Sequence, residues 1–204
     1  EEVQAGKFEG YESTQTTHFS IMDKSGAMVS STQTINGFFG SKLVIPGTGV
    51  ILNNEMDDFA TKVGSSNLFQ AIGGKNNLVE SEKRPLSSMS PTLVLKKGEP
   101  VLTLGTPSGT RILTCVAQTI LNYLEHEEPL VNSVASVRYH QQWSPDYLRV
   151  GSLGLKKETE DELRRMGYTL KHQNLGCRIQ AIAKENGQYI GVSDPRGLGR
   201  ALGK

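Results

Sequence analysis

Residues 15–35 read QTTHFSIMDKSGAMVSSTQTI, and this stretch decides the fold expected for the rest of the chain. Apolar and polar side chains alternate over residues 18–22 and again over residues 27–35. Between them, DKSG at residues 23–26 is typical of a turn. Because alternation on both sides of a turn favours two paired strands, the pattern predicts a β-hairpin that starts at Thr16.

Thr16 stands at the start of this hairpin, and two interpretations of it are open. A threonine hydroxyl inside a chain is a poor nucleophile, but at the start of a chain its own α-amine, with a pKa of about 7.7 to 8, can act as its base. Cleavage of the Gln15–Thr16 bond would make Thr16 such a residue. The alternative is a run of β-forming residues that only leads into a strand.

Length and composition set the outer bounds. With 204 residues, 36% of them hydrophobic and 21% charged, the chain can form one globular domain. The formal net charge of +1 gives no broad basic surface for nucleic acid. No apolar run reaches the roughly 18 residues of a membrane span. The two cysteines, Cys115 and Cys177, lack metal-ligand spacing, and we expect buried thiols.

Beyond the first hairpin, the sequence predicts a second hairpin and three helices. Residues 92–96 and 100–104 flank a Lys-Gly turn, and residues 110–126 carry apolar side chains every four positions. That apolar stripe is wide, which implies burial against a sheet. The other predicted elements are helices at 130–137 and 156–166, strands at 168–171, 178–183 and 189–192, and a long irregular stretch at 59–84. Strands at both ends with helices between them indicate α+β layers.

Four separated segments carry the motifs of one protein family, in the family's order and at its spacings. They are QTTHFS at 15–20, NNEMDDF at 53–59, KRPLSSMSPT at 83–92 and GTPSGTR at 105–111. Together they make the chain resemble the C-terminal, small catalytic subunit of bacterial-type γ-glutamyltransferases, also called γ-glutamyl transpeptidases. The resemblance runs from about Tyr11 to Arg196.

The resemblance implies a fold and a precursor. The fold is the four-layer αββα sandwich of the N-terminal nucleophile hydrolases, of which this chain would supply roughly half. Residues 1–15 would be a tail before an autoprocessing site at Gln15–Thr16, and residues 16–204 the catalytic domain of the small subunit. A larger N-terminal subunit from the same precursor would complete a heterodimer and contribute an arginine to the site. Family members of this kind are periplasmic or secreted.

The resemblance also assigns the reacting groups. The threonine that matches Thr34 hydrogen-bonds the nucleophile in the family, and two backbone amides after it in the chain hold the oxyanion. Those amides fall on Ser108 and Gly109, just before a helix, where negative charge is stabilised. The family commonly has glycine where this chain has Ser108, and a non-glycine residue at positive φ costs on the order of 1 kcal/mol. We expect Ser108 to act through its N–H and not through its hydroxyl.

Five positions match family residues that bind the γ-glutamyl substrate. Asn36, Glu55 and Asp58 would hold its α-amino group, for which an amide and two carboxylates are suitable partners. Ser87 and Ser88 would bind its α-carboxylate. Without the resemblance, such side chains in loops are more often caps, solvated charges or structural serines.

The segment at residues 63–74 matches a lid that some family members have over the γ-glutamyl pocket. Phe69 falls at the position of an aromatic gate residue. Members specialised for polyglutamate capsules generally lack the lid, so it favours glutathione and small γ-glutamyl compounds. Without the resemblance, a surface loop with an incidental phenylalanine is an equal alternative.

The implied activity is transfer of a γ-glutamyl group through an ester on Thr16. Glutathione or another γ-glutamyl compound would be the donor, and water, an amino acid or a peptide would be the acceptor. No metal or other cofactor is implied. Two alternatives stay open: a related acylase of the cephalosporin or glutaryl type, and a non-catalytic, unprocessed fragment.

Overall fold

The predicted first hairpin is present in the computed structural model, which describes residues 15–203. Strands β1 (Thr16–Met22) and β2 (Met28–Thr34) pair antiparallel, with Thr16 opposite Thr34. The Asp23 carboxylate closes the turn, because it accepts the amides of residues 25 and 27 at 2.8 and 3.0 Å. The pairing register therefore places the two threonines side by side at the open end of the hairpin.

A four-stranded antiparallel sheet lies behind the hairpin. Its order is β3-β4-β8-β9, with bounds Thr92–Lys96, Glu99–Gly105, Gln180–Glu185 and Gln188–Ser193. Polar side chains join the two sheets: Ser20 Oγ donates to Gln180 O at 3.0 Å and Ser30 Oγ to Leu104 O at 2.9 Å. The inner face of the hairpin is therefore its polar face.

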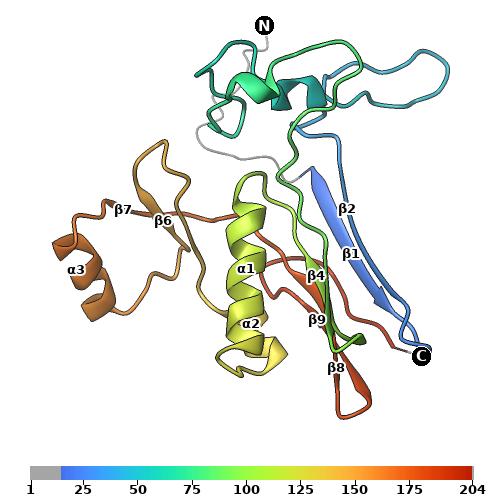
Figure 1. Cartoon of the computed structure of the whole chain (residues 1–204), viewed down its shortest axis with the longest axis vertical. Coiled ribbons are helices and arrows are strands. Elements are labelled where there is room, and N and C mark those ends of the chain that lie inside the picture. Colours follow the sequence, from blue (N-terminus) through green and yellow to red (C-terminus); the bar gives the residue numbers. More distant parts are fainter. Residues whose placement is uncertain (1–14, 204) are drawn as a thin grey trace, which may run out of the picture.

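Two helices cover the opposite face of this sheet, so that helices, sheet and hairpin form three successive layers (Figure 1). They are α1 (Arg111–Leu124) and α2 (Leu130–Ala135). The main core lies between them and the sheet and includes Leu102, Leu104, Ile112, Val116, Val134, Ile179 and Ala181. Within residues 15–203 no fourth helical layer covers the outer face of the hairpin. The described part thus provides the αββ side of the expected αββα sandwich.

The apolar stripe of α1 is narrower in the structure than the sequence indicated. Ile112 and Val116 are 1% and 4% exposed, whereas Leu113 and Leu121 are 54% and 52% exposed. The buried residues of the helix include the adjacent pair Cys115 and Val116, whereas Leu113 and Leu121 lie outside the contact with the core. The predicted burial of this helix against a sheet is confirmed for Ile112 and Val116, which pack in the main core.

A smaller sheet on the far side of α1 was only partly anticipated. Strands β5 (Tyr139–His140), β6 (Leu148–Val150) and β7 (Leu170–His172) form it, and α3 (Lys157–Arg165) connects the parallel pair β6 and β7. Strands β5 and β6 were not predicted, because two or three residues are too few to show a period of two.

The segment between β2 and β3 forms the lobe at the top of Figure 1. Apart from isolated bridges, its regular structure consists of two short 3₁₀ helices, η1 (Glu55–Asp58) and η2 (Lys75–Asn77). The long irregular stretch expected at 59–84 is therefore observed. No helix within residues 15–203 has the length and apolarity needed to cross a membrane.

The expectation of two free thiols was wrong, because Cys115 and Cys177 form a disulfide. Their Cα atoms are 6.5 Å apart although 62 positions separate them in the sequence. Both are buried, at 0% and 4% exposure. The bond ties the middle of α1 to the segment that leads into β8, and a pairing across that distance in sequence cannot be read from local pattern.

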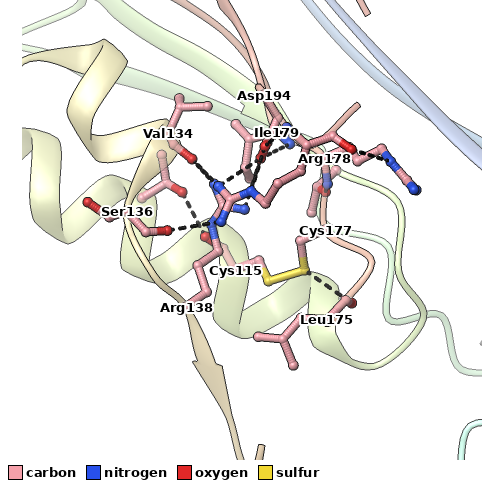
Figure 2. A network of polar contacts seen from close by, with 12 residues as sticks. Cys115, Val134, Ser136, Arg138, Leu175, Cys177, Arg178, Ile179 and Asp194 are labelled. Carbon is pink, nitrogen blue, oxygen red and sulfur yellow. Dashed lines mark hydrogen bonds and ion pairs between the residues drawn. A yellow bond between two sulfur atoms is a disulfide. The ribbon is translucent and has the colours of Figure 1, made fainter. Parts of the chain in front are cut away.

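A buried charge cluster lies beside the disulfide (Figure 2). Arg138 Nη1 and Arg196 Nε donate to the Asp194 carboxylate at 2.9 and 2.7 Å, and the Ile179 amide donates to it at 3.1 Å. Burial by itself raises the pKa of Asp194, but the hydrogen bond from Arg196 and the charge of Arg138 hold it below its usual value. The cluster joins the end of β9 to the segment after α2.

Candidate active site

Thr16 begins β1 and is held by the neighbouring strand. Its Oγ1 lies 2.9 Å from Thr34 Oγ1. The backbone N–H of Asn36 donates to that same Thr34 oxygen at 2.8 Å. The amide occupies one acceptor position of Thr34, and the Thr34 hydroxyl can still donate its proton to Thr16. The structure therefore places the two threonines in the geometry that a positioned nucleophile requires.

His18 fixes the first strand against the loop that follows β4. The imidazole is 6% exposed and bonds Thr32 Oγ1 at 2.7 Å and Ser20 Oγ at 3.1 Å. A Cβ at Gly105 would lie 2.3 Å from this ring, so only glycine fits there. Burial lowers the pKa of His18 to about 4, which keeps it neutral. No role was predicted for His18 from the sequence, and its place on the inward face of β1 was the available signal.

The loop between β4 and α1 presents two unused backbone donors. Ser108 and Gly109 are buried, and within residues 15–203 neither of their N–H groups has a hydrogen-bond acceptor. Buried amides are rarely left unpaired, and an oxyanion hole needs such donors. Thr16 and Pro107, the residue before Ser108, line one cavity of about 440 Å³, so this loop reaches the cavity of Thr16 through Pro107.

Ser108 has φ 131°, a positive value that favours glycine. Its hydroxyl donates to the Leu175 carbonyl and accepts from Arg111 Nε at 3.1 Å. A Cβ at Gly176 would approach Ser108 Oγ to 2.8 Å, so the neighbouring loop is packed closely on it. The hydroxyl is thus used inside the protein, and its amide is the group left for an oxyanion. Arg111 and Leu175 were not anticipated from the sequence.

The residues expected to bind an ammonium group gather around η1. Asn36 is 3% exposed and its Nδ2 donates to Asn54 O at 3.3 Å, directly before Glu55. Burial raises the pKa of Asp58 to about 7, and the charge of Glu55 adds to this shift. The pKa of Glu55 is also raised by burial. A pair of half-buried carboxylates in which Glu55 disfavours the ionisation of Asp58 is well suited to a cationic ligand.

The lid segment, residues 63–74, contacts both the Asp58 carboxylate and the loop between β4 and α1 that contains Ser108 and Gly109. Asn67 Nδ2 donates to Asp58 Oδ1 at 3.3 Å, and the Leu68 amide donates to Asp57 Oδ2 at 2.8 Å. Phe69 is 7% exposed, and a Cβ at Gly109 would lie 2.5 Å from its ring. The phenyl ring therefore rests directly on Gly109.

Ser87 and Ser88 are the predicted residues that the structure does not join to the others. Ser87 Oγ accepts the Met89 amide at 3.2 Å, and the Ser88 carbonyl accepts from Ser90 Oγ at 3.3 Å. In the described part of the chain neither hydroxyl is hydrogen-bonded to Thr16 or Asp58. Their proposed contact with an α-carboxylate remains a prediction.

A metal site would need a cluster of side chains that could bind the ion. Over residues 15–203 there is no group of three or more His, Cys, Asp or Glu side chains that could hold a metal ion.

The layers and the threonine at the start of β1 define a class, the N-terminal nucleophile hydrolases. Within this class the whole sequence, residues 1–204, matches the family model described as gamma-glutamyltranspeptidase, and the chain belongs to that family. Solved structures of the family share the fold. The γ-glutamyltranspeptidase from Pseudomonas nitroreducens, complexed with L-DON, superposes with a TM-score of 0.87 at 43% identity, covering 92% of this chain and 99% of that one.

Curated relatives are similar over nearly the whole chain. The glutathione hydrolase proenzyme of Escherichia coli (strain K12) is 40% identical over 198 residues, which cover 97% of this chain and 34% of that protein. The proenzyme of the same name from Pseudomonas aeruginosa is 44% identical over 197 residues, covering 95% and 35%. The chain thus spans about a third of the length of these relatives. A cephalosporin acylase from Bacillus halodurans, at 19% identity and a TM-score of 0.76, shares the fold alone.

Proposed function

We propose that this chain is the small catalytic subunit of a γ-glutamyltransferase that moves the γ-glutamyl group of glutathione to water or to an amino acid or peptide. The observation that carries the proposal is the Thr16–Thr34 hydroxyl pair at 2.9 Å, at the start of strand β1. The names of the curated relatives, glutathione hydrolase proenzymes, support the same donor.

In the first step the Thr16 hydroxyl attacks the γ-carbonyl carbon while the free α-amine of Thr16 takes its proton. The amides of Ser108 and Gly109 stabilise the oxyanion. The intermediate collapses to a γ-glutamyl ester on Thr16, and cysteinylglycine leaves with the proton from the α-amine. Water or an acceptor amine then attacks the ester and restores the Thr16 hydroxyl.

Substrate binding uses the groups around η1. The carboxylates of Glu55 and Asp58, with the Asn36 amide, hold the α-ammonium group, and Ser87 and Ser88 bind the α-carboxylate. Phe69 covers the pocket from the lid. Because Asp58 is half-buried beside Glu55, a bound ammonium relieves their mutual repulsion, which favours γ-glutamyl donors with a free α-amine.

The Thr16 amine becomes free by autocatalysis. In the precursor, the same hydroxyl attacks the carbonyl of Gln15, and hydrolysis of the resulting ester separates residues 1–15 from Thr16. Except for Gln15, that tail lies outside the described residues. The proenzyme names of the relatives support such processing.

A larger subunit from the same precursor completes the enzyme and supplies an arginine for the α-carboxylate. The relatives' greater length supports this partner. So does the outer face of the hairpin, where Phe19, Ile21 and Val29 are 42%, 50% and 45% exposed. A periplasmic or secreted location is supported by the Cys115–Cys177 disulfide, since disulfides persist in oxidising compartments.

The deciding experiment changes Thr16 in the full precursor. Thr16→Ala should abolish both cleavage at Gln15–Thr16 and turnover of γ-glutamyl-p-nitroanilide, because one hydroxyl performs both reactions. Thr16→Ser keeps a hydroxyl and should retain measurable processing on denaturing gels. Continued cleavage in Thr16→Ala would refute autocatalysis. Turnover of glutaryl but not γ-glutamyl anilide would favour the acylase alternative.

A further inference from the structure

The lid is held from outside by a segment that the proposed mechanism does not use, residues 142–149. Gln142 Nε2 donates to the carbonyl of Phe69 at 3.1 Å, and it also donates to Ser144 O at 3.1 Å. Phe69 is 73 positions away in the sequence. A single side chain therefore forms a hydrogen bond with the backbone of the lid at Phe69, the predicted gate residue.

The other end of the Gln142 amide points to the oxyanion loop. Its Oε1 accepts from Thr110 Oγ1 at 2.7 Å, His140 Nε2 at 2.9 Å and Arg149 Nη1 at 3.3 Å. Donors surround the oxygen and carbonyls surround the nitrogen, which fixes the orientation of the amide. Gln142 therefore connects the lid, through Phe69, to Thr110. Thr110 directly follows Gly109, one of the two predicted oxyanion donors.

Arg149 makes a second connection to the lid. It is 3% exposed, and its Nη2 donates to Gln70 Oε1 at 3.0 Å and to Tyr147 OH at 3.2 Å. Within residues 15–203 its hydrogen-bond partners are all neutral and its Nε has none. This buried cation can therefore bind the lid more tightly if position 70 offers a negative charge.

These contacts hold the Phe69 ring in its position against Gly109, one of the two predicted oxyanion donors. The Phe69 ring rests on Gly109, and the next lid residues are tied to Asp57 and Asp58. With both sides of the lid anchored, the ring cannot leave Gly109 without breaking the bonds to Gln142 and Arg149. The strength of those bonds then sets how often the lid opens.

We propose that Gln142 and Arg149 are positioning residues that latch the lid over the γ-glutamyl pocket and so control how long a donor stays bound. The inference rests on the proposed function for the identity of the ligand. The latch itself rests on the hydrogen bonds to Phe69 and Gln70. The two can therefore be tested separately in the processed full-length enzyme.

The first variant, Gln142→Glu, keeps an oxygen for Thr110, His140 and Arg149 but removes the donor to Phe69. We expect amide exchange in residues 63–74 to become about three- to tenfold faster, the effect of losing one hydrogen bond. The KM for γ-glutamyl-p-nitroanilide should rise by a similar factor, with a smaller change in kcat. Gln141→Glu is the matched control, because Gln141 bonds Asp146 at 2.9 Å and not the lid.

The second variant, Gln70→Glu, should act in the opposite direction. It places a carboxylate beside the Arg149 guanidinium on an exposed lid position, so it does not disturb the core. Exchange in residues 63–74 should slow about three- to tenfold and the KM should fall. Exchange in α1 serves as the internal reference and should stay unchanged in both variants.

Two outcomes decide the proposal. Exchange in residues 63–74 that is the same in Gln142→Glu, Gln70→Glu and Gln141→Glu overturns the latch. Shifts of opposite sign in the first two variants establish it. Failure of the proposed function has a different signature: wild-type enzyme, correctly cleaved before Thr16, that turns over no γ-glutamyl donor.

Discussion

At the scale of single residues, the site depends on what each group's neighbours leave free. The Ser108 hydroxyl is engaged by Leu175 and Arg111, so its amide is the remaining donor. Thr34 accepts an amide hydrogen from Asn36 and still faces Thr16. These contacts explain how serine can replace the family's usual glycine, since its hydrogen bonds compensate for an unfavourable φ.

Asp58 gives a prediction for pH dependence. Its pKa of about 7 in the free protein means that the carboxyl group is protonated below pH 7 and then cannot pair with an ammonium group. The α-amine of Thr16 must also be unprotonated to act as a base. We expect kcat/KM to fall below pH 7 with a limiting log slope of about 2, one proton for each group.

Asp58→Asn tests this assignment. The variant should reduce kcat/KM about 10²-fold, which corresponds to a loss of a few kcal/mol of transition-state stabilisation. The limiting slope should fall to about 1, because only the amine still titrates. Cleavage before Thr16 should continue. A slope that remains near 2 in the variant would show that Asp58 does not bind the donor, and an equal loss of folding or of processing would show that Asp58 has a structural role.

At the scale of elements, the Cys115–Cys177 disulfide joins α1 to the segment that carries Leu175. Since the Leu175 carbonyl accepts a hydrogen bond from the Ser108 hydroxyl, the covalent link also supports the loop that carries Ser108. The Arg138–Asp194–Arg196 cluster braces the same region (Figure 2).

Removing the disulfide should therefore affect stability and turnover together. For a separation of 62 residues, Cys115→Ala with Cys177→Ala should lower the free energy of unfolding by about 4 kcal/mol. Urea unfolding of the processed enzyme measures this difference, and kcat should fall as Ser108 loses its support. A loss below about 1 kcal/mol would mean that the bond contributes little to this fold.

At the scale of the whole molecule, the hairpin is turned with its polar face inward and its apolar face outward. Phe19, Ile21 and Val29 lie on the outer face, where the αββα architecture requires a further layer. An exposed apolar face of this kind is typical of a subunit interface.

Ile21→Lys in the full precursor should block assembly, because a buried lysine without a partner is strongly unfavourable. Size-exclusion chromatography should show separated or aggregated chains, and γ-glutamyl turnover should be lost. Leu153→Lys is the matched control, since Leu153 follows β6, outside the hairpin, and is 86% exposed. Normal assembly of Ile21→Lys would exclude this face as the interface.

Elements whose signals are local could be predicted from the sequence. Both hairpins, the long helix α1 and the irregular stretch before β3 follow from residue periods and turn residues within a few positions of each other. The four family motifs added the predicted roles of Thr16 and of the substrate-binding residues. The periodic pattern alone left these roles open.

Which face of each element is buried and which is exposed became known from the folded chain. The pairing of Cys115 with Cys177, the outward apolar face of the hairpin and the contact between Gln142 and Phe69 join residues that are distant in sequence or depend on what covers them. Periodicity shows that a strand has two different faces but not which one meets the core, because that depends on the layers packed around it. Here polar hydrogen bonds between the sheets placed the polar face inward.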